Sequence, residues 1–370
     1  MHAGEKDGIE MSSRVLIAGF ATRHVARSAR AAGYRVCCVD HFCDQDLVAV
    51  ADECRCFSDL EALPVAISDM AERYRFDLFV PTSGAELLDV PIPRFAPAPE
   101  TAAPFMDKLC MAGYLSGLGV PVPATLPEGT FPAMLKPSEG SGGWRNTVVR
   151  NRDDWVAWKE MMEDPPVIWQ EVVSGIPASV CCVCNGTAAR AVAVNEQILR
   201  GGTEARYGFS GSITPFVHPL AGEMVRYAEK IASGSGCVGT LGVDFVVGDR
   251  PYVIEVNPRF QGTVDTVEMA TGVNLFSLHV SACEGQLPET NFTPRQFAAR
   301  KILFAEEDLI VDKNLMHYSR FISDIPWPGA SFEKGEAVVS VYGTGPDRHS
   351  ALEVLDKHIS TVRQYIKGSS

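Results

Sequence analysis

The sequence lacks any apolar run close to the roughly 20 residues that a membrane-spanning helix needs. Its first ten residues are polar and acidic, unlike a secretory signal. Basic residues are outnumbered, with 33 Lys and Arg against 46 Asp and Glu, and the net charge of −13 argues against nucleic acid or an anionic membrane as partner. We therefore expect a cytoplasmic protein, and its 370 residues suffice for two or three domains.

Several common functional motifs are missing as well. Eleven cysteines are present, but no C-x₂-C pair recurs with a second pair at zinc-like spacing, so we interpret them as small buried apolar residues in a reducing compartment. A βαβ opening, with strands at 14–19 and 34–39 around a helix at 23–32, lacks the G-x-G-x-x-G spacing of a dinucleotide site. No Ser/His/Asp or Cys/His set stands out, and the eight histidines are scattered, so we expect them to be structural or solvent-facing.

The most informative segment that is present spans residues 252–259, YVIEVNPR. Side chains alternate along a strand, so Glu255, Asn257 and Arg259 are expected on one face and Ile254 on the other. A carboxylate and an amide oxygen suit a hard cation such as Mg²⁺. An adjacent guanidinium suits phosphate oxygens held by that cation. The pattern favours a metal–phosphate site over an ordinary strand edge.

A second acid strengthens this interpretation. Residues 239–247 read as a strand, and the turn at 248–251 leads back into the first segment. The resulting hairpin is predicted to place Asp244 close to Glu255. Two neighbouring buried carboxylates indicate either a cation between them or a shared proton, and we favour the cation.

Three further segments are candidate binding regions. The strand at 78–81 runs into Thr82, Ser83 and Gly84, at a strand's carboxyl end where ligands commonly sit. The strand at 131–137 ends on Lys136 and a glycine-rich turn that resembles a phosphate cradle, although it is not a P-loop, and a flexible hairpin with an exposed lysine is the alternative. Residues 195–212 are predicted to form a long polar loop, functional or simply mobile.

The remaining regions are organised as follows. A proline-rich stretch at 90–104 reads as a boundary between units, and a helix is predicted from 105 to about 117. Beyond residue 290 we predict strands at 298–304 and 336–341, a turn at Gly343-Thr344-Gly345, and a helix from about 347 to 366.

In this order the segments resemble the ATP-grasp superfamily, its carboxylate–amine ligases in particular and biotin carboxylase more distantly. The resemblance is carried by Met106-Asp107-Lys108, by Met134-Leu135-Lys136-Pro137, by residues 168–175 (IWQEVVSG), by the Asp244 strand and by Glu255-Val256-Asn257-Pro258-Arg259. It extends from about residue 14 to 365, and only the last motif is highly specific by itself.

The resemblance implies an α/β fold with five parts. They are a leader at 1–13, an N-terminal parallel βαβ pre-ATP-grasp domain at 14–104, a small nucleotide-clamping lobe at 105–168, a larger lobe with an antiparallel sheet and the metal site at 169–290, and a closing C-terminal part at 291–370.

It also implies roles for individual residues. Lys108 and Lys136 would hold the ATP phosphates, and Ser141, Gly142 and Gly143 would form the loop over them. The backbone of Gln170, Glu171, Val172 and Val173 would read adenine. Asp244, Glu255 and Asn257 would bind one or two Mg²⁺, with Mn²⁺ as the alternative ion, and Arg259 with Lys136 would act on the transferred phosphate. The acid that holds the ribose in many relatives is missing here, which leaves Ser179, Glu171 or water.

The implied reaction joins a carboxylate to an amine through an acyl phosphate, releasing ADP and phosphate. Thr82, Ser83 and Gly84 are candidates for the acyl substrate; Arg206 and Tyr207 are candidates for an amino-acid-like substrate, and Glu196 or Glu204 for its ammonium group. The alternatives are a carboxylase acting through carboxyphosphate, although no Met-Lys-Met biotin-attachment site is present, and an ATP-binding regulatory protein without activity. Small molecules are the expected partners, and a homodimer is left open.

Overall fold

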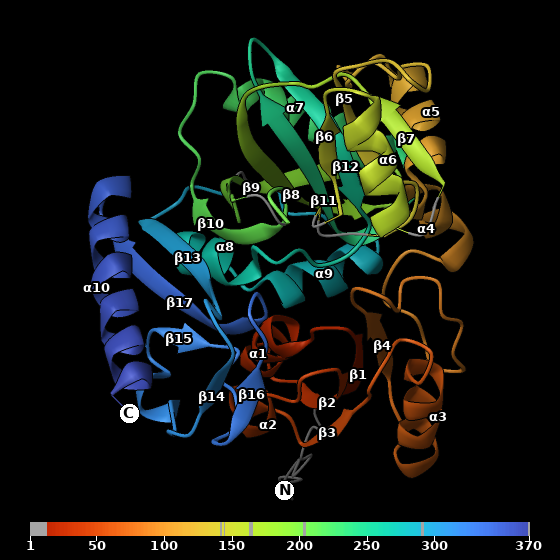
Figure 1. The fold of residues 1–370 in the computed structure, drawn as a ribbon. Helices are drawn as coiled ribbons and strands as arrows, with labels where there is room; N and C mark the ends of the chain where they lie inside the picture. Colours follow the sequence, from red (N-terminus) through yellow and green to blue (C-terminus); the bar gives the residue numbers. More distant parts are fainter. Residues whose placement is uncertain are drawn as a thin grey trace, which may run out of the picture.

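The computed structural model describes residues 13–140, 143, 145–162, 166–202, 205–289 and 292–368 (Figure 1). Ser141, Gly142 and Glu204, three of the predicted site residues, lie outside these ranges. Within the described part of the chain, no helix has both the length and the apolar character of a membrane span.

The N-terminal part is a parallel sheet with strand order β3-β2-β1-β4, drawn in red and orange in Figure 1. Its elements are β1 (Arg14–Gly19), α1 (Arg23–Ala31), β2 (Arg35–Asp40), α2 (Gln45–Val50), β3 (Glu53–Cys56), α3 (Leu63–Arg73) and β4 (Leu78–Pro81). Successive residues of β1 pack alternately into two apolar clusters on opposite faces, which is why the whole strand is apolar. The predicted βαβ opening is confirmed.

The carboxyl ends of β1 and β4 meet at one edge of this sheet. The Thr82 N–H donates to the Ala18 carbonyl at 2.7 Å, and the Phe20 N–H donates to the Ser83 carbonyl at 2.7 Å. Gly19 has φ +149°, and a Cβ there would stand 2.2 Å from Thr82 Oγ1, so this crossing requires glycine. The glycine thereby brings Phe20 and Ser83 to the same edge.

The region predicted as one helix from residue 105 to about 117 is divided at Asp107. α4 (Pro99–Met106) ends before Asp107, whose extended backbone lets its carboxylate accept the N–H groups of Leu109 and Cys110, both at 2.8 Å. Lys108 is consequently the first residue of α5 (Lys108–Leu118). Both helices pack on the large sheet, with Phe105 and Met111 in its apolar cluster.

A small antiparallel sheet with order β6-β5-β7 lies at the top right of Figure 1. It consists of β5 (Ala133–Pro137), β6 (Thr147–Val149) and β7 (Val167–Gln170), and α6 (Arg152–Met161) contacts it. Leu135, Trp158 and Trp169 form its core. The register sets Lys136 opposite Ile168, so the predicted strand lysine sits within a sheet.

The large sheet is antiparallel, in the order β12-β11-β8-β9-β10-β13-β17-β15. Its strands are β8 (Ile176–Asn185), β9 (Ala189–Leu199), β10 (Phe209–Thr214), β11 (Val238–Val247), β12 (Pro251–Asn257), β13 (Phe297–Phe304), β15 (Ile322–Ser323) and β17 (Ala337–Gly345). The helices associated with it are α7 (Ala221–Gly234), α8 (Val264–Thr271), α9 (Leu275–Cys283) and α10 (Arg348–Lys367). A separate pair, β14 (Leu309–Val311) and β16 (Ala330–Phe332), and a 3₁₀ turn, η1 (Met316–Tyr318), complete the fold.

Two sequence-based expectations are wrong. The expected long loop at 195–212 is wrong at both of its ends, because residues 195–199 belong to β9 and 209–212 to β10, which pair with Ile198 opposite Gly211. The described residues 200–202 and 205–208 lie between the two strands. The expected turn at Gly343-Thr344-Gly345 is the end of β17. Its glycines serve packing instead, since a Cβ at Gly343 would stand 2.4 Å from the Ala351 carbonyl oxygen of α10.

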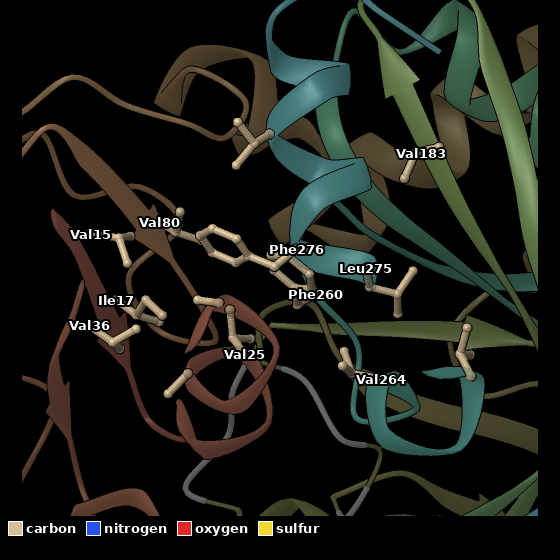
Figure 2. Packing of buried hydrophobic residues seen from close by; sticks show 14 of the residues in the cluster. Val15, Ile17, Val25, Val36, Val80, Val183, Phe260, Val264, Leu275 and Phe276 are labelled. Atoms are coloured by element: carbon tan, nitrogen blue, oxygen red, sulfur yellow. The ribbon is translucent and has the colours of Figure 1, made fainter. Parts of the chain in front are cut away.

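An apolar cluster joins the N-terminal sheet to the large sheet. Figure 2 shows Phe260 and Phe276 between Val25 of α1 and Val183 of β8. Because α9 is packed between the two sheets, the carboxyl edge of the N-terminal sheet is held against the β11–β12 hairpin region.

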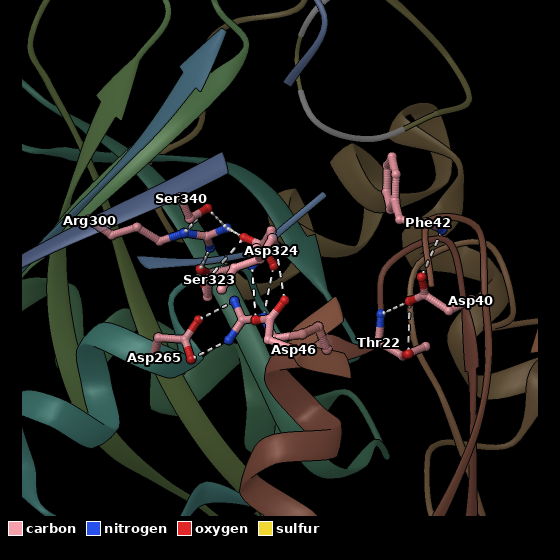
Figure 3. Close-up of polar contacts among 12 residues, drawn as sticks. Thr22, Asp40, Phe42, Asp46, Asp265, Arg300, Ser323, Asp324 and Ser340 are labelled. Carbon is pink, nitrogen blue, oxygen red and sulfur yellow. Dashed lines mark hydrogen bonds and ion pairs between the residues drawn. The ribbon is translucent and has the colours of Figure 1, made fainter. Parts of the chain in front are cut away.

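A buried ionic network makes a second junction between these parts (Figure 3). Arg23 of α1 donates to both carboxylate oxygens of Asp265 of α8 at 2.8 and 2.7 Å, and to Asp324 at 2.8 Å. Arg300 of β13 also contacts Asp324, at 3.0 Å. These partners hold the pKa values of Asp265 and Asp324 well below the usual range despite burial, so both carboxyl groups stay ionised.

Candidate functional site

A cavity of about 440 Å³ opens where the three sheets meet. Residues from the N-terminal edge, the small sheet and the large sheet all contribute to its wall. The lining residues are Phe20, Ala21, His24, Thr82, Ser83, Pro123, Met134, Lys136, Gly143, Asn146, Gln170, Glu171, Val173, Gly175, Pro177, Gln197, Leu199, Tyr207, Phe209, Asp244, Val246, Ile254, Glu255, Asn257, Arg259, Phe260, Gln261, Gly262 and Thr263.

The predicted acidic hairpin lies in this wall. β11 and β12 pair with Asp244 directly opposite Glu255, as expected. A β-bulge lies between Asp244 and Phe245, which makes Phe245 pair with Val253 and leaves Ile254 as the extra residue. Ile254 and Glu255 therefore both face the cavity, so the expected strict alternation is wrong at Ile254.

Asp244 is surrounded by amide donors rather than by cations. Its carboxylate accepts hydrogen bonds from Gln197 at 2.9 Å, Gln261 at 3.1 Å and Asn257 at 3.2 Å. Burial, together with the adjacent Glu255 carboxylate, raises the pKa of Asp244 to about 7. Two carboxylates held side by side in this way repel one another, and a cation bound between them would relieve that repulsion.

Gly242 has a specific part in this arrangement. A Cβ at this position would lie 1.7 Å from the Gln261 Cδ atom, so only glycine leaves room for that side chain to reach Asp244.

The two predicted lysines differ in their exposure to the cavity. Lys136 is buried and lines it, and burial lowers its pKa to about 8 against the opposing effect of Glu255. Lys108 does not line the cavity, and its Nζ donates to the Gly140 carbonyl at 2.6 Å. Burial lowers the pKa of Lys108 as well, and Glu255 again opposes the shift. Glu255 is therefore the acid shared by both lysines.

Arg259 reaches the cavity in contact with the N-terminal part. Its Nη1 lies 3.1 Å from Glu86 Oε1, and Glu86 Oε2 accepts the Gly84 N–H at 2.6 Å. The Arg259–Glu86 contact is an ion pair without hydrogen-bond alignment, and Nη1 is buried without a hydrogen-bond partner. Glu86 was not foreseen from the sequence, because it is 173 positions away from its partner in the chain.

The segment that was expected to read adenine is largely at the cavity. Gln170, Glu171 and Val173 line it, whereas Val172 does not and is 38% exposed. Ser179, one of three sources considered for a ribose contact, is not brought to the cavity. It is fully buried on β8 and its hydroxyl accepts the Asn195 amide N–H at 3.2 Å.

Of the predicted phosphate loop, the structure describes only part. Gly143 lines the cavity with φ +68°, and a Cβ there would stand 2.6 Å from the Tyr207 carbonyl oxygen. The loop between β9 and β10 therefore contacts the glycine turn directly. Tyr207 lines the cavity itself.

The structure places some of the predicted substrate residues at the cavity and others away from it. Thr82 and Ser83 line the cavity, whereas Gly84 contributes only its N–H to Glu86. Arg206 does not line the cavity, and its guanidinium lies over the Tyr207 ring, 5.9 Å from the centroid. Glu196 does not line it either, because it forms a two-bond ion pair with Arg348 at 2.6 and 2.9 Å.

Several cavity residues were missed. Gln197 follows from the alternation of β9 once that strand is recognised, and Gln261 lies two positions beyond Arg259 on the same motif. His24, expected to be structural or solvent-facing, lines the cavity with its pKa lowered to about 4, chiefly by burial and by Arg23. Phe20 and Phe209 carried no sequence signal, since isolated phenylalanines are ordinary core residues.

Unpaired polar atoms concentrate in this cavity. Five buried side-chain N or O atoms of the described residues lack a hydrogen-bond partner, and four of them belong to cavity residues: Gln170 Oε1, Arg259 Nη1, Gln261 Oε1 and Thr263 Oγ1. Burying such groups costs about 1–3 kcal/mol each unless a partner arrives. A polar ligand would supply those partners, so the cavity is built for one.

The donor set also fits a particular kind of cation site. Asp244, Glu255 and Asn257 offer hard oxygen ligands. Across the described residues, however, no group of three or more His, Cys, Asp or Glu side chains is placed to hold an ion. Such a set fits Mg²⁺ whose remaining ligands come with a substrate, rather than a permanently caged structural metal.

Sequence comparison matches residues 105–263 to a family model described as an ATP-grasp domain. An uncharacterised protein of Methanocaldococcus jannaschii is 30% identical over 209 residues, which cover 56% of this chain and 50% of the relative. The chain thus spans about half the length of the curated relative that it matches.

Solved structures resemble almost the whole chain. The biotin carboxylase domain of Hydrogenobacter thermophilus 2-oxoglutarate carboxylase, in complex with MgADP, ADP and bicarbonate, has a TM-score of 0.78 and 15% identity over 95% of this chain and 90% of that one. The L-amino acid ligase of Bacillus licheniformis has a TM-score of 0.72 and 15% identity over 94% and 97%. At these identities the likeness establishes the fold, which is the predicted α/β class.

Proposed function

This chain is a member of the ATP-grasp superfamily, and we propose that it is an ADP-forming ligase that joins a carboxylate to an amine. The observation that carries the proposal is that one cavity, where three separate sheets meet, collects a lysine, an acidic hairpin, an arginine and three further side chains with a buried polar atom that lacks a hydrogen-bond partner. Each type of group matches one part of a magnesium–ATP complex and its reacting carboxylate.

The nucleotide would lie between the small and the large sheets. Gln170 and Glu171 at the end of β7 line the cavity together with apolar Met134, Val246 and Ile254, which suits a planar base with a polar edge. The unpaired Gln170 Oε1 is an acceptor that an exocyclic amino group could satisfy.

The phosphates would lie by the lysines and the acidic hairpin. Lys136 inside the cavity and Lys108 behind it would neutralise phosphate oxygens, and Gly143, with Ser141 and Gly142, would cover them. Asp244, Glu255 and Asn257 would hold Mg²⁺, which when bound supplies charge neutralisation for phosphoryl transfer. A fold neighbour solved in complex with MgADP supports ATP and Mg²⁺ as the ligands in general terms.

The reaction follows from the chemistry of carboxylates. A carboxylate is a poor acyl donor because oxide is its leaving group, and transfer of the γ-phosphoryl group converts it into an acyl phosphate that an amine can attack. Arg259 would stabilise the transferred phosphoryl group, and Glu86 would hold its guanidinium in position. Binding and charge placement supply the catalysis, so no covalent enzyme nucleophile is needed.

Replacing Glu255 tests this proposal. We expect Glu255→Gln to lower kcat/KM for Mg²⁺-dependent ADP release about 100-fold, because it removes one metal ligand and leaves its volume unchanged. The matched control is Glu353→Gln on α10, whose carboxylate pairs only with the exposed His349 at 3.3 Å among the described residues. Wild-type turnover by the Glu255→Gln variant would refute the proposed role.

The same assay separates the alternatives. Bicarbonate-dependent ADP release without any amine would indicate a carboxylase acting through carboxyphosphate. Binding of MgATP without turnover on any carboxylate–amine mixture would indicate a regulatory ATP-binding protein.

A further inference from the structure

The part of the cavity wall next to Arg259 comes from the N-terminal sheet and from the start of α8. Phe20 and Ser83 are joined by their backbone hydrogen bond, and Glu86, three residues beyond Ser83, contacts Arg259. Arg23, which precedes His24 in α1, is bound to Asp265 near the start of α8. These contacts form a subsite that adjoins the proposed position of the transferred phosphoryl group.

Two unpaired acceptors lie in this subsite. The Gln261 amide uses its Nε2 to bond Asp244, which leaves Oε1 buried without a partner. Thr263 is 2% exposed, and its Oγ1 also lacks a partner. The Gln261 amide oxygen requires an N–H or O–H donor from the ligand, whereas the Thr263 hydroxyl can accept or donate. An amine nitrogen beside the acyl phosphate can bond both.

Apolar side chains line the same cavity. They are Phe20 of the N-terminal edge, Leu199 of β9 and Phe209 of β10. Phe209 approaches within 3.3 Å of the Cβ position of Gly262, so a larger residue at 262 would displace the ring. Flat apolar walls of this kind favour an aromatic or other apolar group on the ligand.

Charge is balanced around this subsite. His24 is neutral near pH 7 because its pKa is lowered to about 4. Arg23 is fully engaged by Asp265 and Asp324. Among the described lining residues, the charged side chains are Lys136, Glu171, Asp244, Glu255 and Arg259, which belong to the nucleotide and metal parts of the cavity. Arg259 and Asp244 adjoin this subsite, but the proposed function assigns them to the transferred phosphoryl group and to the metal, so a second charged group on the amine substrate would compete with those ligands.

We propose that the acceptor substrate is a primary amine carried on an uncharged aromatic body, with the nitrogen at Gln261 and Thr263 and the body between Phe20 and Phe209. This proposal rests on the proposed ligase function. The amine lone pair forms the C–N bond to the acyl carbon, the C–O bond to phosphate breaks, and the amine proton leaves with the phosphate. The two acceptors orient the nitrogen for that attack.

Binding calorimetry tests the proposal without knowledge of the carboxylate substrate. The full chain is saturated with Mg²⁺ and a non-hydrolysable ATP analogue, and 2-phenylethylamine, ethanolamine and phenylalanine are titrated in turn. We expect 2-phenylethylamine to bind at least about tenfold more tightly than the other two, because ethanolamine has no ring to bury and phenylalanine carries a second charged group that the subsite does not pair.

Two aromatic residues provide a matched pair of variants. Phe20 lines the cavity and is 40% exposed, whereas its neighbour Phe42 is 45% exposed and does not line it, with the ring centroids 5.2 Å apart. Phe20→Ser should remove most of the preference for 2-phenylethylamine, and Phe42→Ser should retain it. Thr263→Val should weaken binding of every amine.

The outcomes separate the two proposals. If the nucleotide analogue binds and ethanolamine or phenylalanine binds as tightly as 2-phenylethylamine, the aromatic-amine proposal is overturned and the ligase proposal stands. The same holds if Phe20→Ser leaves the preference unchanged. If the nucleotide analogue itself does not bind, the ligase proposal fails and the substrate proposal fails with it.

Discussion

The pH dependence of kcat/KM for ATP should be bell-shaped, with its maximum between about pH 7 and pH 8. Asp244, with a pKa raised to about 7, must be ionised to hold Mg²⁺, so activity falls as the pH decreases below that value. Lys136, with a pKa lowered to about 8, must be protonated to neutralise phosphate, so activity falls as the pH increases above that value.

The size of the decline in kcat/KM on each side of the maximum follows from the pKa shifts of Lys136 and Asp244. Burial lowers the pKa of Lys136 from 10.5 to about 8, a penalty on the charged ammonium of about 3 kcal/mol. One pH unit above that pKa only about one molecule in ten keeps the charge, so kcat/KM at pH 9 should be about tenfold below its maximum. The same reasoning applied to Asp244 gives about a tenfold loss at pH 6.

Lys136→Arg isolates the alkaline limb. A guanidinium stays charged at every accessible pH, so the variant should lose the decline above pH 8 while keeping the decline below pH 7. The assay is initial-rate ADP release at subsaturating ATP from pH 5.5 to 9.5, with the fold checked by circular dichroism at each end. An unchanged alkaline limb in Lys136→Arg, or a flat wild-type profile, would refute the assignment.

Two further substitutions test how the site is supported. Gly242→Ala should displace the Gln261 side chain and lower kcat/KM for ATP about tenfold. The control Gly222→Ala should be neutral, because an added Cβ there meets nothing within 4 Å. Equal activities of the two variants would show that the close contact at Gly242 is relieved without cost. Arg23→Met should lower the urea-derived free energy of unfolding by about 3–5 kcal/mol, because it leaves buried acids unpaired. The control Arg30→Met, at a surface ion pair, should lower it by less than about 1 kcal/mol. A loss below about 1 kcal/mol in Arg23→Met would contradict the structural role of the network.

Local sequence determined the elements that position the candidate metal ligands. The alternation and turn residues of the 239–257 hairpin were sufficient to predict that Asp244 lies opposite Glu255, because both depend on neighbouring positions in the chain. The βαβ opening and the strand lysine were predictable for the same reason. The bulge at Ile254 was not, because it changes the side-chain direction without a local sequence signal.

Residues distant in sequence escaped prediction wherever packing decided their partners. Glu196 carries a charge suited to an ammonium ligand, yet the register of β9 places it against Arg348 of α10. Ser179 has a suitable hydroxyl, yet it is fully buried on β8. A sequence specifies which groups are available, and only the register and packing of sheets decide which of them reach one cavity.

The sequence by itself thus determined the fold class and the types of group that an ATP site needs, because periodicity and motif spacing are local properties of the chain. The tertiary structure decided which side chains share that site. It brought Glu86 to Arg259, and Phe20 to the cavity that Thr263 and Gln261 also line. The physical reason is that burial, charge compensation and unpaired polar atoms exist only after separate sheets pack together, and these properties define the cavity.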